Sequence, residues 1–196
     1  MRGFARGVSK LLWSISYRGT KNIPPKDAFP YIIASNHQAY FDPAWIGGPI
    51  TQKMSFMAWG EAFDWKVVGP MIRHLGAFPV FLGGAKALTS IKTALRSLKD
   101  GAVLVIFPEG ERSFSDGKMQ EFKAGVAGIS IRAQVPILPV TIKGGNRVWA
   151  QGQKWPHFFT PVEITYHPLI HPPPSAENDA EAELCSKLQA VIGSSL

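Results

Sequence analysis

The feature that most constrains the fold is an amphipathic helix pattern followed at once by an unbroken apolar run. Within residues 85–99, aliphatic side chains recur at helical spacing: Leu88, Ile91, Leu95 and Leu98. Asp100-Gly101 ends this helix, and residues 102–107, Ala-Val-Leu-Val-Ile-Phe, contain no polar side chain. Because such a strand has no polar face for solvent, the pattern indicates a sheet that is covered on both faces.

Other short apolar runs extend this alternation along the chain. Further strands are predicted at residues 31–34, 54–57, 77–81, 136–142 and 162–166. Further helices are predicted from Asp42-Pro43 (Asp at the N-cap), in parts of 61–75 interrupted at Gly69-Pro70, at 122–133, and from the acidic segment 177–183 onward. The alternation predicts an α/β fold with a central, mostly parallel sheet flanked by helices.

The first residues of the chain are basic and carry an apolar stripe. Residues 1–21 contain five basic residues and no acid, and aliphatic and aromatic side chains recur among them at helical spacing: Phe4, Val8, Leu11, Leu12 and Ile15. We predict an amphipathic helix over 1–21 that either lies in a membrane interface or docks on the protein's own core. The predicted organisation is this helix, an α/β domain over 22–171, and a Pro linker with a C-terminal helix over 172–196.

Composition bounds the class of protein and its partners. The 196 residues are 45% hydrophobic, which suits one domain with a full core. The net charge of +7 favours anionic partners such as membrane lipid or phosphorylated small molecules, and no nucleic-acid-binding motif is present. We expect no transmembrane span, because no run of about 18 apolar residues occurs, and no convincing secretory signal. The single cysteine, Cys185, flanked by Glu181 and Glu183, is a poor nucleophile candidate.

A first group of polar residues follows the predicted strand at 31–34. Residues 36–42 read Asn-His-Gln-Ala-Tyr-Phe-Asp and run into a predicted helix. Ligands of α/β folds gather outside the carboxyl ends of strands, where His37 could act as a general base and Asp42 could hold its imidazole. The alternative is a solvated loop histidine, with Asp42 serving only as a helix cap.

A second group follows the apolar strand at 102–107. Residues 107–113 read Phe-Pro-Glu-Gly-Glu-Arg-Ser. Gly110 allows close approach of a ligand to the backbone, Arg112 offers a guanidinium suited to phosphate, and Glu109 and Ser113 can bond to hydroxyls or to each other. The alternative is an ordinary turn with a surface Glu–Arg pair.

Together the two segments resemble the glycerophospholipid acyltransferase family, which includes the lysophosphatidic acid acyltransferases. Residues 36–42 match its Asn-His-x4-Asp motif, residues 107–113 match Phe-Pro-Glu-Gly-Thr-Arg-Ser except at Glu111, and residues 135–140 match its Val-Pro-Ile-x-Pro-Val motif. The resemblance covers roughly residues 18–145, with the motifs in the family's order.

The resemblance implies a role for each matching residue. His37 would remove the proton from an acceptor hydroxyl that attacks an acyl thioester, and Asp42 would orient His37. The residues implied to bind substrate are Asn36, Glu109, Gly110, Arg112, Ser113 and Lys86. The donor would be acyl-CoA or acyl-ACP, and the acceptor a lysolipid. The resemblance implies no metal and no cofactor, and places the protein on the cytoplasmic face of a membrane.

One family motif is altered. Where the family has an arginine that holds the acceptor's phosphate, after Gly76 and an apolar stretch, this chain has Leu82. Either Arg112, Lys86 or Arg73 holds the phosphate, or the acceptor has none at that place. Two other classes of protein are alternatives to an acyltransferase. One is a serine lipid hydrolase, which would need a Gly-x-Ser-x-Gly elbow that the chain lacks. The other is a membrane-binding module without catalysis.

Overall fold

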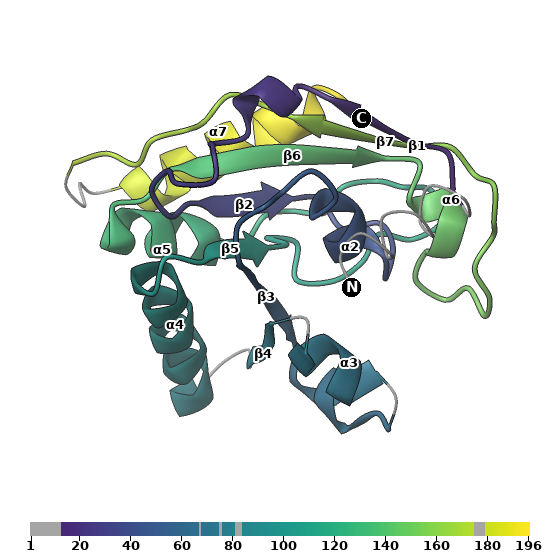
Figure 1. Ribbon diagram of the computed structural model, residues 1–196, viewed down its shortest axis with the longest axis horizontal. Helices are drawn as coiled ribbons and strands as arrows, with labels where there is room; N and C mark the ends of the chain where they lie inside the picture. Colours follow the sequence, from purple (N-terminus) through teal and green to yellow (C-terminus); the bar gives the residue numbers. More distant parts are fainter. Residues whose placement is uncertain (1–12, 67, 75, 81–83, 175–178) are drawn as a thin grey trace.

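Figure 1 shows one central sheet with helices packed against it. The computed structural model describes residues 13–66, 68–74, 76–80, 84–174 and 179–196. Within these residues seven strands form the sheet, in the order β1-β7-β6-β2-β5-β3-β4, and every neighbouring pair is parallel except β6 with β7. The strands are β1 (Ile15–Arg18), β2 (Ile32–Ser35), β3 (Met54–Trp59), β4 (Ala77–Val80), β5 (Val103–Ile106), β6 (Ile137–Lys143) and β7 (Val162–Tyr166). The predicted α/β fold with a mostly parallel sheet is confirmed.

Helices lie on both faces of this sheet. They are η1 (Thr20–Asn22), α2 (Asp42–Ile46), η2 (Gly60–Asp64), α3 (Val68–His74), α4 (Gly84–Lys99), α5 (Gly125–Ala133), α6 (Asn146–Trp149) and α7 (Ala180–Gly193). One hydrophobic core lies between the sheet and α4, α5 and α7, and the second core includes Trp45 of α2. None of the helices in the described part of the chain is both long and apolar enough to cross a bilayer.

The central strands are largely apolar because each contributes to both cores. In β2, Ile32 and Ala34 belong to the core beneath α4, α5 and α7, whereas Ile33 points into the opposite core with Trp45. Successive side chains of a strand point to opposite faces, so a strand buried on both sides has apolar residues at most positions and not only at alternate ones. This explains the continuous apolar runs of the sequence.

The prediction of a helix over residues 1–21 is wrong for Ile15–Arg18, which form the edge strand β1; residues 1–12 lie outside the described part of the chain. Ile15 and Tyr17 are partly buried while Ser16 and Arg18 are exposed, which is the two-residue period of a strand. The tertiary partner decides this, because β1 pairs in parallel with β7 and Tyr17 stacks on Tyr166. The helical spacing that ends at Ile15 masked the alternation.

Two smaller corrections concern helix starts. Asp42 is the first residue of α2 rather than its N-cap, which is Phe41. Gly69-Pro70 does not interrupt a helix but lies in the first turn of α3, where proline is tolerated because its missing N–H has no intrahelical partner.

The topology brings three loops to one edge of the sheet. The parallel strands β2, β5 and β6 are neighbours, so the segments that leave their carboxyl ends meet. In Figure 1 the arrowheads of β2 and β6 point toward α2 and α6. Residues 36–41 follow β2, residues 107–113 follow β5, and Gly144-Gly145 follow β6. Both polar groups of the sequence therefore lie at this edge, as predicted for parallel strands.

Candidate active site

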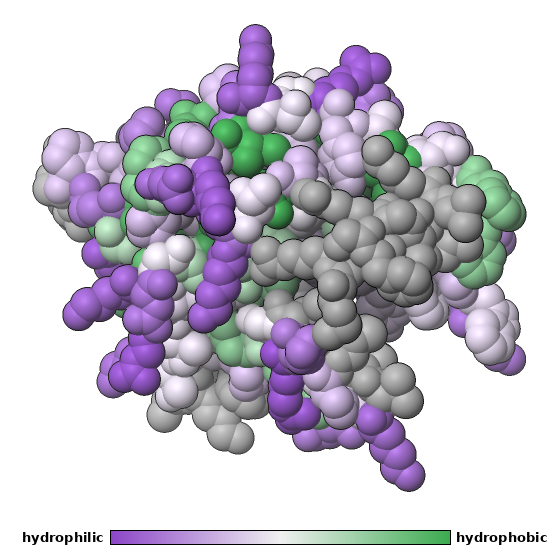
Figure 2. Space-filling view, viewed as in Figure 1, coloured by the Kyte–Doolittle hydropathy of each residue, from purple (hydrophilic) through white to green (hydrophobic). Residues whose placement is uncertain are grey.

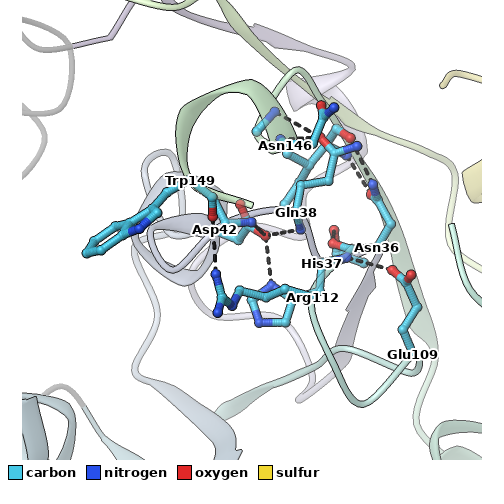
Figure 3. Close-up of polar contacts among 12 residues, drawn as sticks. Asn36, His37, Gln38, Asp42, Glu109, Arg112, Asn146 and Trp149 are labelled. Atoms are coloured by element: carbon cyan, nitrogen blue, oxygen red, sulfur yellow. Dashed lines mark hydrogen bonds and ion pairs between the residues drawn. The ribbon is translucent and has the colours of Figure 1, made fainter. Parts of the chain in front are cut away.

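His37 and Asp42 form a bonded pair at the carboxyl edge of the sheet. Nδ1 of His37 lies 2.8 Å from Oδ2 of Asp42, and Figure 3 shows the imidazole beside this carboxylate. Oδ2 also accepts the backbone N–H groups of Gln38 and Ala39, at 2.6 and 2.8 Å. The Asp42 side chain is fully buried while that of His37 is 19% exposed. Because Oδ2 of Asp42 is held by these backbone donors, it fixes the orientation of the His37 ring. A carboxylate oxygen at this position favours the tautomer with the proton on Nδ1, which leaves Nε2 as the nitrogen that can accept a proton.

The loop that carries His37 is held by the second motif. The backbone N–H of His37 donates to Oε1 of Glu109 at 2.7 Å, and the carbonyl of His37 accepts the backbone N–H of Ser113 at 2.8 Å. The ring of Phe107 stacks against the imidazole, with centroids 4.1 Å apart and an angle of 20° between the planes. These contacts join His37 to residues 70 or more positions away in the sequence and fix both its backbone and its ring.

Glu109 is a buried carboxyl that bridges two backbone segments. Its other oxygen, Oε2, accepts the N–H of Gln120 at 2.6 Å, and the residue is 2% exposed. Burial raises the pKa of Glu109 to about 7; the N–H groups of Gln120 and His37 oppose this, while the negative charges of Asp42 and Glu111 add to it. Both carboxyl oxygens of Glu109 thus accept backbone N–H groups in this structure. The role in substrate binding that the sequence suggested for Glu109 stays a prediction.

Arg112 lies on an aromatic surface beside the pair. Its guanidinium carbon is 3.5 Å from the centroid of the Tyr40 ring, and Nη1 donates to the carbonyl of Trp149 at 3.2 Å. Burial lowers the pKa of Arg112, and the neighbouring Tyr40 and Asp42 oppose that shift. The group stays charged at neutral pH, because arginine does not lose its proton in proteins. The structure therefore brings a fixed cation to the His37 loop.

Lys123 is a second cation at this edge that the sequence analysis did not single out. Gly110 has φ 79°, in the left-handed region, and a Cβ built on it would lie 2.6 Å from Nζ of Lys123. The backbone N–H of Lys123 donates to the carbonyl of Pro108, which holds the segment against the second motif. The only available signal was a lysine shortly before α5, and nothing local in the sequence links it to Gly110.

Asn36 and Gln38 hold neighbouring loops in place. The Asn36 amide donates to the carbonyl of Ile142 at 2.8 Å and accepts the Ile142 N–H at 2.7 Å, so it joins β2 to β6 beyond the end of β2. Oε1 of Gln38 accepts the backbone N–H of Gly145 at 2.8 Å, at the start of α6. Asn36 is 1% exposed, so its predicted role in substrate binding would be indirect. No pattern in the sequence pointed to this contact of Gln38.

The remaining predicted residues are placed as follows. Ser113 is buried, and its hydroxyl has no hydrogen-bond partner among the described residues. Lys86 lies in the first turn of α4, and its side chain is outside the described atoms, as is Leu82. Arg73 lies over the ring of Phe63, in a separate hollow of about 390 Å³ beside η2 and β4 whose lining shares no residue with the His37 loop.

Two further features that could carry chemistry are the single cysteine, Cys185, and any group of possible metal ligands. Cys185 is buried in the core, where burial first and then Glu121 raise the pKa of its thiol. The prediction of a poor nucleophile agrees with this direction, but the neighbouring acids named from the sequence, Glu181 and Glu183, are not the cause. Among the described residues, no three His, Cys, Asp or Glu side chains are grouped so as to hold a metal ion.

Comparison with known proteins gives a consistent picture. The chain is 36% identical over 148 residues to a 1-acyl-sn-glycerol-3-phosphate acyltransferase of Streptococcus pneumoniae, covering 72% of this chain and 53% of that protein. It is 28% identical over 179 residues to a chloroplastic 1-acyl-sn-glycerol-3-phosphate acyltransferase of Brassica napus, covering 87% of this chain and 51% of that protein. The chain thus spans about half the length of these relatives.

A solved structure and a protein family also match. The crystal structure of the 1-acyl-sn-glycerophosphate acyltransferase of Thermotoga maritima superimposes with a TM-score of 0.80 at 29% identity, covering 99% of this chain and 76% of that one. The family described as Acyltransferase matches residues 14–143, which contain the His37–Asp42 pair and the second motif. Since this match covers more than half of the sequence, the chain belongs to the acyltransferase family.

Proposed function

We propose that this protein transfers a fatty acyl chain from an acyl thioester to a hydroxyl of a lysophosphatidate-like glycerolipid, as an O-acyltransferase of phospholipid biosynthesis. The observation that carries the proposal is the pairing of His37 with the buried carboxylate of Asp42, at 2.8 Å, on the ligand-binding edge of a parallel sheet. Relatives named 1-acyl-sn-glycerol-3-phosphate acyltransferases support the same reaction class.

The proposed reaction needs only a general base. Nε2 of His37 takes the proton of the acceptor hydroxyl as its oxygen attacks the thioester carbonyl, and Asp42 stabilises the imidazolium that forms. The new C–O bond forms, the C–S bond breaks, and the departing thiolate takes the proton back from His37. The acyl chain is never attached to the protein, and the reaction requires no metal and no cofactor.

The acceptor's phosphate is assigned to the cations beside this pair. Arg112, held against Tyr40, offers a planar fork for phosphate oxygens. Lys123, whose Nζ lies over Gly110, adds a second charge beside the same motif. Lys86 stays a third candidate from the sequence. Arg73 is the weakest of the candidates, since it lines a separate hollow with Phe63. In this proposal Arg112 and Lys123 together take the place of the arginine that the family has at position 82.

The donor is a thioester of coenzyme A or of acyl carrier protein, both of which are anionic and suit a basic chain of net charge +7. In this proposal the protein works at the cytoplasmic face of a membrane as a peripheral protein, since its acceptor and product are lipids of the bilayer and its donors are soluble thioesters. Parallel assays with acyl-CoA and with acyl-ACP show which of the two the protein uses as its acyl donor.

A panel assay tests the function. Purified protein is incubated with radiolabelled acyl-CoA or acyl-ACP and with lysophosphatidate, lysophosphatidylcholine or monoacylglycerol, and products are identified by lipid mass spectrometry. We expect phosphatidate to form. Arg112→Ala should raise the KM for lysophosphatidate by tenfold or more, and a tenfold change corresponds to ~1.4 kcal/mol of binding free energy. Arg96→Ala, on the exposed face of α4, is the matched control. No acyl transfer to any acceptor would leave the alternative of a non-catalytic membrane-binding module.

The leucine at position 82 favours one second candidate, an acceptor without phosphate. Leu82→Arg restores the cation that the family has there. It should improve or preserve activity on lysophosphatidate if the acceptor carries a phosphate. If the natural acceptor is neutral or zwitterionic, the new charge should lower activity, and a loss on lysophosphatidate itself contradicts the preferred acceptor.

A further inference from the structure

Residues 150–161, between α6 and β7, expose an unusual number of large aromatic rings, and we name this segment the aromatic loop. Trp155 is 73% exposed, Phe158 50% and Phe159 76%. Apolar area left in water is unfavourable by ~25 cal/mol per Å², so three such rings within five residues mark a surface that meets another apolar phase.

Hydrogen bonds to the rest of the protein fix the backbone of the aromatic loop, so its exposed rings have defined positions. Nε1 of Trp13 donates to the carbonyl of His157 at 2.9 Å, and the His157 N–H donates to the carbonyl of Val148 at 2.8 Å. The side chain of Gln153 accepts the Ala150 N–H at 2.8 Å. Phe159 keeps φ at 58°, a conformation that costs free energy for a bulky residue, while its ring stays in solvent. Folding alone gives no reason for that arrangement.

A row of aromatic contacts connects the loop to the active site. The ring of Phe158 stacks on Trp13 at 5.7 Å, Trp13 contacts Phe41 at 4.6 Å, Phe41 contacts Trp149 at 5.7 Å, and Trp149 contacts Tyr40 at 4.8 Å. Tyr40 in turn lies against the guanidinium of Arg112. The aromatic loop therefore projects from the edge of the sheet that carries His37. Figure 2 shows hydrophobic side chains at the right-hand margin, where Figure 1 draws the segment between α6 and β7.

The charge of this surface is positive. Residues 144–162 contain Arg147 and Lys154, both exposed, and no acidic residue. Tryptophan and phenylalanine beside basic side chains are the composition of segments that lie in the headgroup region of anionic bilayers. A standard protein interface needs about 800 Å² on each partner with matched polar groups, which a short loop of this kind does not supply.

We propose that the aromatic loop inserts into anionic lipid surfaces and sets the carboxyl edge of the sheet, with His37, against the bilayer. The aromatic loop is a different segment of the chain from the basic residues 1–12. The benefit of the orientation rests on the proposed function, since an acceptor and product that stay in the bilayer would then reach His37 without crossing water. The insertion itself does not depend on catalysis.

The test compares two matched double variants. Trp155→Ser with Phe159→Asn removes the two most exposed rings of the loop; Phe158 is kept because it stacks on Trp13, and asparagine suits the positive φ at position 159. Phe29→Ser with Leu88→Gln removes two exposed hydrophobic side chains outside the loop, which are 50% and 62% exposed. The full chain and both variants are sedimented with vesicles of phosphatidylcholine and phosphatidylglycerol, and with vesicles of phosphatidylcholine alone.

We expect the loop variant to lose about tenfold or more in affinity for the mixed vesicles, while the control binds like the unmodified protein. Brominated lipids should quench tryptophan fluorescence in the unmodified protein and less in Trp155→Phe. Equal binding of loop variant and unmodified protein overturns the proposal. The proposal is also overturned if the unmodified protein does not bind vesicles but forms a dimer, and the loop variant abolishes that dimer.

Activity assays separate this proposal from the proposed function. On short-chain substrates dissolved as monomers, the loop variant should react at the unmodified rate, and on bilayer-borne lysophosphatidate it should be slower. If the unmodified protein transfers no acyl chain in either assay, the proposed function fails, and the vesicle experiment still decides whether the loop inserts.

Discussion

The Nδ1 atom of His37 lies 2.8 Å from Oδ2 of Asp42, and the same oxygen accepts two backbone N–H groups from the intervening loop. The four-residue spacing thus has a structural reason as well as a chemical one. It lets a single buried carboxylate close its own loop and orient the histidine at the loop's start. The backbone bonds hold the carboxylate in place for the proton transfer that we propose for His37.

Replacing the histidine tests the base directly. His37→Ala should lower kcat/KM for acyl transfer by ~10²–10⁴-fold, the usual contribution of a general base. The fold should survive, because the backbone bonds of residue 37 to Glu109 and Ser113 do not involve the ring. Circular dichroism checks the fold, and His171→Ala, at an exposed position, is the matched control. An unimpaired rate in folded His37→Ala protein would remove His37 from the mechanism.

Replacing the aspartate separates charge from geometry. In Asp42→Asn the side-chain oxygen must stay where Oδ2 is, since the Gln38 and Ala39 N–H groups repel an amide NH₂ there. The hydrogen bond to His37 then survives without its negative charge. We expect a loss of ~10²-fold or more in kcat with little change in KM, because the imidazolium is no longer stabilised. A variant with normal kcat would reduce Asp42 to a structural role.

The buried carboxyl of Glu109 predicts a pH dependence of stability. Its pKa is about 7 in the folded protein against an ordinary 4.5, so the folded state holds this proton more tightly than the unfolded chain. The stability linked to this group is therefore complete below about pH 4.5 and is lost as the pH rises to about 7. A difference of this size corresponds to about 3 kcal/mol.

Urea unfolding at several pH values measures this dependence. Between pH 4.5 and 7, the free energy of unfolding of the unmodified protein should fall relative to that of Glu109→Gln, which has no titrating group there. Glu61→Gln, at an exposed position, should follow the unmodified protein. Parallel curves for Glu109→Gln and the unmodified protein would contradict the raised pKa.

The N-terminal segment gives a separate membrane prediction. Deletion of residues 2–12 should weaken binding to anionic vesicles, because it removes three basic residues at ~1 kcal/mol each near such a surface, together with apolar side chains. Binding of the intact protein should also weaken as salt rises. The deletion stops before Trp13 and β1, which belong to the core and the sheet.

Sedimentation with vesicles checks this prediction, and combining the deletion with the aromatic-loop variant shows whether the two surfaces act independently. If the shortened protein sediments as well as the intact one, residues 2–12 are not an anchor. A shortened protein that no longer unfolds cooperatively would instead show that these residues support the fold.

The sequence by itself determined the fold class and pointed to the pairing of His37 with Asp42. Each of these rests on a local pattern: the helix spacing of 85–99 beside the apolar run of 102–107, and the fixed spacing from His37 to Asp42. A strand buried on both faces is apolar at most positions, so the covered sheet is visible in the composition of single segments. The parallel topology then brings the two polar motifs to one edge without further information.

Only the tertiary structure decided how that edge is completed. Ile15–Arg18 became a strand because the edge of β7 offered a partner, which outweighs local helical spacing. Glu109 became a clamp on backbone N–H groups, and Lys123 came to lie over Gly110, through contacts across the sheet. The rings of Trp155 and Phe159 are apolar residues like any others in the sequence, and only their exposure distinguishes them. Contacts between distant segments leave no periodic trace in the chain, because they depend on how whole elements pack rather than on neighbouring residues.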